Sequence, residues 1–139
     1  MEKLIDIKWF ILLLSLLLLT ACTDEELSYQ ENFPFEVIVM PVREELAIGD
    51  TAEIRMSIQT PEEFQDAKYH IRYFQFDGYG ELRYYNENPY LPNDFYLLAE
   101  KEFRLYYTSQ SEETQNLSVW ISDNFGNEKK IDFQFKNEN

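Results

Sequence analysis

Hydrophobic and polar residues alternate with a period of two along most of the chain beyond residue 33. In residues 52–58, for example, Ala, Ile, Met and Ile occupy every second position, and Glu, Arg and Ser occupy the positions between them. Successive side chains of a β-strand point to opposite faces of a sheet, so this spacing predicts strands and not helices. The same alternation recurs in residues 35–39, 69–73, 103–107, 117–121 and 131–135.

Glycines and prolines separate these alternating runs. All four glycines and all five prolines lie at the ends of runs or in a loop between them. Six or seven short strands with turn residues between them predict an all-β fold, an immunoglobulin-like antiparallel β-sandwich of about seven strands. Trp120 lies on the opposite face to Val119, so both faces of its strand are expected to be partly covered. The expected core residues are Val37, Ile54, Met56, Ile71, Leu105, Val119, Trp120 and Phe133.

The chain begins with an apolar run, residues 9–19, that leads into Leu19, Thr20, Ala21 and Cys22. This order is typical of a lipoprotein signal peptide with its lipobox, in which small residues give the signal peptidase access to the backbone and the cysteine thiol takes a diacylglycerol. The alternative is a transmembrane helix, but that needs about 20 apolar residues and this run is much shorter. The sequence therefore predicts a signal peptide over residues 1–21 and a mature protein held to a membrane by lipidated Cys22.

The residues from the lipidated cysteine onward are polar and acidic. Residues 22–32 contain one Asp and three Glu, and we interpret them as a flexible tether that carries a single domain over residues 33–139. Acidic residues directly after the cysteine are also similar to the surface-export signals of some Gram-negative lipoproteins. An Asp after the cysteine marks inner-membrane retention in some bacteria, and this chain has Thr23 there. We therefore expect a cell-envelope location at the outer membrane, on the periplasmic side or the cell surface.

The net charge and the cysteine content bear on two questions: whether the protein binds nucleic acid, and whether disulfide bonds stabilise its domain. The formal net charge is −14 at pH 7, and residues 1–21 contribute nothing to it because their two acids and two bases cancel. Such a charge repels nucleic-acid phosphates, so direct binding to nucleic acid is not expected. Cys22 is the only cysteine, so no disulfide can form inside the domain and the core must hold by packing.

The chain offers little material for catalysis. Its one histidine, His70, lies in the middle of a predicted strand, and there is no second His or Cys with which to build a zinc site. No recognisable Ser-His-Asp set or Gly-rich phosphate loop occurs. We therefore expect no enzymatic activity, no metal and no cofactor.

Residues 123–127, Asp-Asn-Phe-Gly-Asn, lie between two alternating runs. Asp and Asn side chains can bond back to the backbone and Gly accepts a positive φ, so this segment predicts a tight hairpin. The alternative is a calcium loop. That would need the alternating oxygen ligands and the distal Glu of an EF-hand, which this segment lacks.

Residues 77–99 are rich in aromatic side chains mixed with Pro, Asn and Asp. Tyr combines a large contact area with a polar tip and loses little conformational entropy on binding, which suits recognition. The alternative is that these rings close over one end of the sandwich as a satellite core, and both can hold at once. The candidate partner-binding residues are Tyr79, Tyr84, Tyr85, Tyr90, Phe95 and Tyr96.

An ordered set of short runs covers nearly all of the mature chain. The runs are Phe33-Pro34-Phe35-Glu36-Val37, Val39-Met40-Pro41-Val42, Glu53-Ile54-Arg55-Met56, Arg72-Tyr73-Phe74-Gln75-Phe76-Asp77-Gly78, Leu82-Arg83-Tyr84-Tyr85, Pro89-Tyr90-Leu91-Pro92-Asn93-Asp94, Phe103-Arg104-Leu105-Tyr106-Tyr107-Thr108-Ser109-Gln110 and Val119-Trp120-Ile121-Ser122-Asp123-Asn124-Phe125-Gly126-Asn127-Glu128. Together they resemble the TraQ family of conjugal transfer proteins encoded on conjugative transposons. The resemblance implies a lipid-anchored immunoglobulin-like domain that accompanies a transfer apparatus, and it brings no catalytic residues with it.

From the resemblance and the lipobox together we expect an accessory envelope component of a conjugative transfer apparatus. Its expected partners are other envelope proteins of the transfer machinery, and its N-terminal lipid holds it to the membrane. Such a role predicts a contiguous patch of exposed aromatic side chains within residues 79–96, or an unpaired sheet edge that can accept a partner strand. The alternatives are a surface glycan- or ligand-binding module and a recipient-side lipoprotein that excludes redundant transfer.

Overall fold

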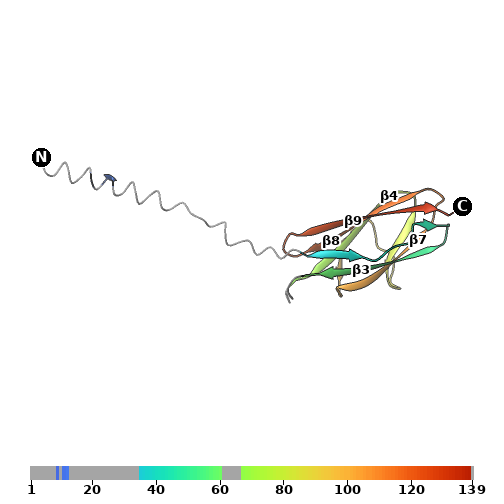
Figure 1. The fold of residues 1–139 in the computed structure, drawn as a ribbon, viewed down its shortest axis with the longest axis horizontal. Helices are drawn as coiled ribbons and strands as arrows, with labels where there is room; N and C mark the ends of the chain where they lie inside the picture. Colours follow the sequence, from blue (N-terminus) through green and yellow to red (C-terminus); the bar gives the residue numbers. More distant parts are fainter. Residues whose placement is uncertain (1–8, 10, 13–34, 61–66, 139) are drawn as a thin grey trace. The chain divides into compact units, whose positions relative to one another are not determined.

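The computed structural model describes residues 9, 11, 12, 35–60 and 67–138 (Figure 1). The chain divides into two compact units, Met1–Glu31 and Asn32–Asn139. The predicted lipobox and tether lie outside the described residues, so the lipidation of Cys22 stays a prediction. Among the residues that are described, no helix is long and apolar enough to cross a membrane.

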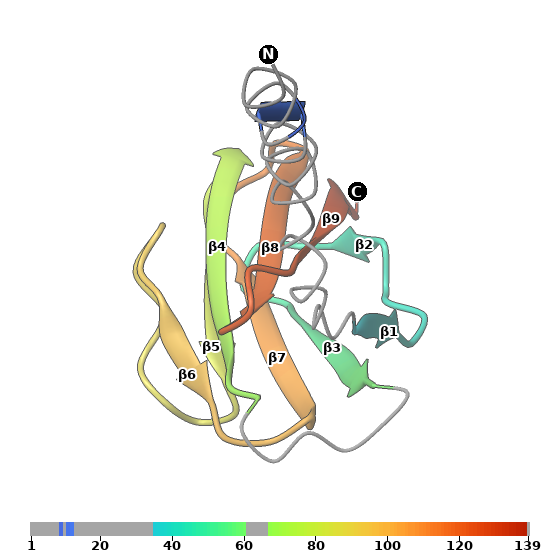
Figure 2. The same ribbon diagram turned by 90° about the vertical axis from the view of Figure 1, so that its left-hand side faces the viewer.

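The described part of the second unit consists of nine strands in two layers. Figure 2 shows β4, β8, β9 and β2 side by side above β5, β7, β3 and β1. One sheet has four strands in the order β1-β3-β7-β5, and the other has five in the order β2-β9-β8-β4-β6. The strands are β1 (Glu36–Val39), β2 (Glu45–Leu46), β3 (Thr51–Gln59), β4 (Tyr69–Asp77), β5 (Gly80–Tyr84), β6 (Tyr96–Leu98), β7 (Glu102–Ser109), β8 (Gln115–Asp123) and β9 (Glu128–Asn137).

This arrangement confirms the predicted sandwich of immunoglobulin type. Immunoglobulin domains pack a sheet with strand order A, B, E, D on a sheet of strands C, F and G. In this chain β1, β3, β7 and β5 correspond to strands A, B, E and D. Strands C, F and G correspond to β4, β8 and β9. Two additional strands, β2 and β6, extend the second sheet at its two edges. They have two and three residues, which is too short for an alternating pattern to reveal them.

One strand pair departs from the expected antiparallel arrangement. β2 runs parallel to β9, with Glu45 opposite Lys136. Glu36, at the start of β1, forms an ion pair with Lys129 near the start of β9, so β1 and β2 follow β9 in the same direction while the chain moves from one sheet to the other. Pro41 lies in this crossing and cannot donate to a ladder, which helps to end β1 there.

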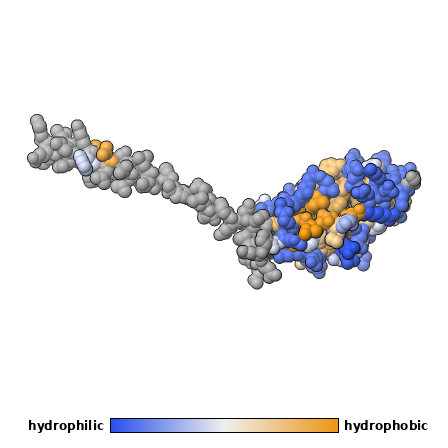
Figure 3. Space-filling model, in the orientation of Figure 1, coloured by the Kyte–Doolittle hydropathy of each residue, from blue (hydrophilic) through white to orange (hydrophobic). Residues whose placement is uncertain are grey.

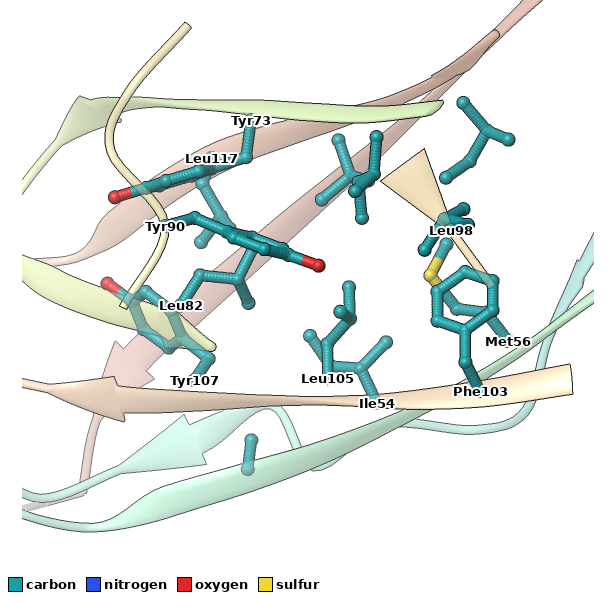
Figure 4. Packing of buried hydrophobic residues seen from close by; sticks show 14 of the residues in the cluster. Ile54, Met56, Tyr73, Leu82, Tyr90, Leu98, Phe103, Leu105, Tyr107 and Leu117 are labelled. Carbon is teal, nitrogen blue, oxygen red and sulfur yellow. The ribbon is translucent and has the colours of Figure 1, made fainter. Parts of the chain in front are cut away.

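Side chains from the inner faces of both sheets form one core (Figure 4). Figure 4 shows Tyr73 and Leu117 of the five-stranded sheet facing Leu82 and Tyr107 of the four-stranded sheet. Each strand contributes the apolar half of its alternating pattern, as β3 does with the burial of every second residue from Ala52 to Ile58. Of the predicted core residues, the fully buried ones are Ile54, Met56, Ile71, Leu105 and Val119.

Three predicted core residues are placed differently. Trp120 is half-buried on the outer face of the five-stranded sheet, because it alternates with Val119 and Ile121 and these two point inward. Val37 and Phe133 are only partly buried and pack against the core. Val37 lies on the edge strand β1. Phe133 lies on the part of β9 that β2 does not pair with.

A small polar network joins the two sheets at one end of the core. The hydroxyl of Tyr107 on β7 donates to Oε1 of Gln115 at 2.6 Å and accepts a hydrogen bond from Nε2 of Gln75 at 2.9 Å. Gln115 is fully buried, and its Nε2 donates to Oγ of Ser109 at 2.7 Å. Burial raises the pKa of Tyr107 to about 12 although the hydrogen bond with Gln75 lowers it, so this hydroxyl keeps its proton at neutral pH.

Gly80 begins β5 directly against this network. A Cβ atom at this position would overlap the hydroxyl and ring of Tyr107. Carbon atoms in contact normally lie about 3.5–4.0 Å apart, so any larger residue would force the network to move. The requirement for glycine here comes from this close approach.

The hairpin between β8 and β9 forms as predicted. The N–H of Asp123 donates to the carbonyl of Asn127 at 3.0 Å. Oδ1 of Asp123 accepts from the N–H groups of Phe125 and Asn127 at 2.9 and 2.8 Å, and Gly126 has a φ of 90°. The acidic side chain is therefore used to stabilise the turn by hydrogen bonds to the backbone.

Candidate interaction surface

The outer face of the five-stranded sheet carries a line of aromatic side chains. On β4, Tyr69, Ile71 and Tyr73 are buried, so Arg72 and Phe74, which alternate with them, point outward. The ring of Phe74 lies 5.0 Å from that of Phe76, edge to face, and the ring of Phe76 lies 6.5 Å from that of Trp120 on β8. A register irregularity between Gln75 and Asp77 occurs at this point of the ladder. We call Phe74, Phe76, Trp120 and Phe95 the aromatic row.

Arg72 connects Phe95 to the rest of the aromatic row. Its guanidinium carbon lies 4.0 Å from the centre of the Trp120 ring and 5.6 Å from that of Phe95. The same guanidinium donates to Oδ1 of Asn93 at 3.1 Å, which ties the loop before β6 to the sheet. Lys130 on β9 approaches the Trp120 ring to 5.7 Å. Contacts of this kind contribute about 0.5–1 kcal/mol each at exposed sites, so these cations help to fix the Trp120 and Phe95 rings.

Much of this surface is exposed to water. Phe76 is 54% exposed and Phe95 is 61% exposed. Leu97 on β6, which pairs with His70 of β4, is 63% exposed and extends the apolar surface along the same face. Beside Phe76 the sheet has an open depression of about 370 Å³, lined also by Ser118, Lys130 and Asp132. Apolar side chains exposed together in this way are typical of protein–protein interaction sites.

The six candidate residues of segment 77–99 do not form one site. Tyr90 is 7% exposed and belongs to the core, and Figure 4 shows its ring between the side chains of Tyr73 and Leu82. Tyr96 is half-buried and its ring stacks on that of Tyr90 at 4.4 Å. Tyr84 and Tyr85 are half-buried and pack against the core. Only two of the six, Tyr79 and Phe95, are largely exposed.

Segment 77–99 therefore divides between the core and the exposed surface. Tyr90 and Tyr96 close one end of the sandwich, and the N–H of Tyr90 donates to the carbonyl of Leu82 at 2.8 Å. Burial raises the pKa of Tyr90, so its phenol stays neutral. Phe95 belongs to the aromatic row, and the other three members of the row, Phe74, Phe76 and Trp120, lie outside the segment.

The sequence did contain a signal for those three residues. Phe74 and Phe76 occupy the polar half of the alternation in their strand, which makes β4 apolar on both faces. Trp120 similarly stands between inward-pointing Val119 and Ile121. Apolar residues on the solvent face of two neighbouring strands indicate a surface patch, but only if the pairing of those strands is known.

The described residues show no arrangement suited to metal chemistry. Within them, no group of three or more His, Cys, Asp or Glu side chains could hold a metal ion. His70 is half-buried in β4, opposite Ser122 of β8 and Leu97 of β6.

Comparison with known proteins gives the family of this chain. The TraQ conjugal transfer protein family matches residues 5–138. The chain belongs to this family. The sequence resemblance is therefore confirmed over nearly the whole length, and the TraQ family places the chain among proteins of conjugative transfer. No curated protein matches the chain.

Solved structures agree with the TraQ assignment. A conjugative transposon lipoprotein from Bacteroides eggerthii is 45% identical, with a TM-score of 0.70, over 75% of this chain and 98% of its own. A lipoprotein from Bacteroides thetaiotaomicron is 40% identical, with a TM-score of 0.72, over 84% of this chain and 89% of its own. A conjugate transposon protein from Bacteroides vulgatus is 42% identical, with a TM-score of 0.68, over 82% of this chain and 92% of its own.

Proposed function

We propose that this protein is a lipid-anchored accessory component of a conjugative transfer apparatus, and that it binds another envelope protein of that apparatus without catalysing a reaction. The observation that carries the proposal is the aromatic row, an exposed apolar surface on a strongly acidic domain of a conjugal transfer family. The lipoprotein relatives support a place in the cell envelope.

The aromatic row has the composition of a binding surface. Full burial of a Phe or Leu side chain is favourable by about 1.5–3 kcal/mol, and Phe76, Phe95 and Leu97 are each more than half exposed. Burying all three in a complex would therefore contribute a few kcal/mol. Arg72 and Lys130 add charged hydrogen-bond donors beside the rings, and aromatic and Arg side chains are enriched in the energetic centres of interfaces.

A glycan-binding role fits this surface less well. Sugar rings stack on an uncovered aromatic face, and one face of the Trp120 ring is occupied by the Arg72 guanidinium at 4.0 Å.

The lipidated Cys22 and the residues up to the domain would keep the binding surface near the membrane. A tether of about ten residues spans at most about 33–36 Å when extended, so the proposed partner lies at the membrane or close to it.

Transfer assays with matched surface variants test this proposal. In a donor that lacks the gene, the double variant Phe76→Ala with Phe95→Ala should restore mating about tenfold less well than the intact gene. The control is Ile38→Ala with Met40→Ala on the four-stranded sheet, whose side chains are 42% and 49% exposed. This control should restore transfer fully.

Photo-crosslinking identifies the partner. A photoreactive residue in place of Leu97 should cross-link a protein encoded on the same conjugative element in mating donors, whereas one in place of Ile38 should not. If both double variants restore transfer equally and both positions give the same cross-links, the aromatic row is not the partner surface.

A further inference from the structure

We propose that β9 is a strand-docking site, at which an extended segment of a partner protein adds to the five-stranded sheet beside residues 128–134. The segment has apolar residues at every second position and Lys or Arg between them. This site uses the backbone edge of β9, which lies next to the aromatic row, and it holds whether or not the aromatic row acts in conjugative transfer.

The backbone of β9 has one unpaired side over most of its length. On that side, β2 pairs only with Lys136 and Asn137, and the N–H of Lys136 donates to the carbonyl of Glu44 at 2.8 Å. Every second residue of a strand directs its N–H and C=O to the same side. Lys130, Asp132 and Gln134 therefore present theirs on the side of β2, where the described residues supply no strand.

The other sheet edges are shorter or covered. β1 has four residues and β6 has three. The outer side of β5 is occupied in part by the segment after it, because the N–H of Tyr90 donates to the carbonyl of Leu82 at 2.8 Å. Unpaired edges are the places where extended segments of other chains add to a sheet. Residues 128–134 are the longest such stretch in the described part of the sandwich.

An apolar strip lies next to this edge, between β9 and β1. Its members are partly buried hydrophobic side chains that pack against the core: Val37, Val39, Val42, Ile131 and Phe133. Figure 3 shows an apolar area between the places that β1 and β9 occupy in Figure 1. A strand added to β9 would direct every second side chain toward the interior of the sandwich, and apolar residues at these positions would cover the strip.

Charge favours Lys or Arg at the remaining positions of the added strand. The two lysines at the start of β9 already have carboxylate partners, since Lys129 lies 3.7 Å from Glu36 and Lys130 lies 3.7 Å from Asp132. The chain as a whole carries −14. A field of this sign accelerates the approach of a cationic segment and repels an acidic one. The occupant is therefore a cationic strand of alternating pattern and not a second copy of this acidic chain.

A synthetic peptide serves as the probe. It has about nine residues, enough to span residues 128–134 in extended form, with Val and Lys in strict alternation. A second peptide of the same composition has all its Lys before all its Val, which keeps the charge and removes the alternation. Amide hydrogen exchange is measured by NMR on the unlipidated mature chain, residues 22–139, with each peptide at millimolar concentration.

The alternating peptide should slow exchange at Lys130, Asp132 and Gln134 by about tenfold or more, because these amides gain a hydrogen-bond partner. The second peptide should leave them unchanged. Asp132→Pro removes one donor on the unpaired side and should weaken binding about tenfold. Asp132→Ala is the control. Like Asp132→Pro, it loses the hydrogen bond between the Asp132 carboxylate and Ser118, but it keeps the backbone N–H and should bind the peptide as the parent does.

Three results would overturn the proposal. The first is unchanged exchange at these amides at saturating peptide. The second is equal protection by both peptides, which would show attraction by charge alone. The third is slower exchange as the protein concentration rises without peptide, which would make the occupant a second copy of this chain. If Asp132→Pro fails to fold, the exchange data on the parent chain still decide.

Discussion

Replacing Tyr107 by Phe tests how the polar network joins the two sheets. The substitution removes only the hydroxyl oxygen. The ring stacks on that of Phe135 with centroids 4.9 Å apart and an interplanar angle of 9°, and this contact remains in the variant. The change therefore leaves no large cavity, and its cost reports on hydrogen bonding.

The magnitude follows from the partners that lose the hydroxyl. Gln115 is fully buried, and its Oε1 receives the Tyr107 hydroxyl at 2.6 Å. A buried acceptor left without a donor costs about 1–3 kcal/mol. The free energy of unfolding of Tyr107→Phe should fall by this amount, which is a large share of the roughly 5–15 kcal/mol typical of a domain.

A double-mutant cycle with Gln115→Met separates the network from packing. Removing both partners leaves neither the Tyr107 hydroxyl nor the Gln115 carbonyl oxygen without the other, so the double variant should be more stable than the sum of the two single losses by about 1 kcal/mol or more. Urea unfolding followed by fluorescence gives the free energy of unfolding of the parent, the two single variants and the double variant. Tyr106→Phe on the same strand is the control, and its free energy of unfolding should change by no more than about 0.5 kcal/mol. A loss for Tyr107→Phe no larger than that of the control, or a coupling energy of zero, would refute the role given to the network.

Four other measurements test the rest of the structure. Ile54→Ala at a fully buried site should cost about 2–5 kcal/mol in denaturant melts, and a loss near zero would mean that β3 faces the other way. Gly80→Ala should destabilise by about 1–3 kcal/mol because its Cβ would overlap Tyr107, and an unchanged melt would contradict this close approach. Burial raises the pKa of Tyr107 in the folded protein from the ordinary value of about 10 to about 12. Its contribution to stability is therefore fully present below pH 10 and is lost as the pH rises toward 12. Tyr107→Phe should lose less stability across that range than the parent, and an equal loss would remove Tyr107 as a cause. Cys22→Ala should abolish incorporation of labelled fatty acid, and retained label would place the lipid elsewhere.

The alternation of residues was enough to predict the sandwich and most of its core. Ile54, Met56 and Leu105 were assigned to the interior because each recurs at every second position of an apolar run, and a strand has only two faces. The hairpin at residues 123–127 was equally accessible, since an Asp two to four residues ahead of the amides that it binds is a local feature. Local patterns of this kind depend on neighbouring residues alone.

The remaining features depend on pairing between distant strands. β2 exists only because Glu45 and Leu46 meet the end of β9, about 90 residues further along the chain, and two residues cannot show a period. The aromatic row likewise joins β4, the loop before β6, and β8. A continuous aromatic-rich segment of sequence points to Phe95, but Phe76 and Trp120 join the aromatic row only through strand pairing.

The measurement that tests the central claim most directly is mating frequency from a donor with an in-frame deletion of this gene. The deletion is complemented either by the intact gene or by Cys22→Ala at matched expression. The account predicts that transfer falls in the deletion strain and that only the lipidated form restores it, as expected for a membrane-anchored working part of the apparatus. Unchanged transfer in the deletion strain, or full restoration by Cys22→Ala, would contradict it.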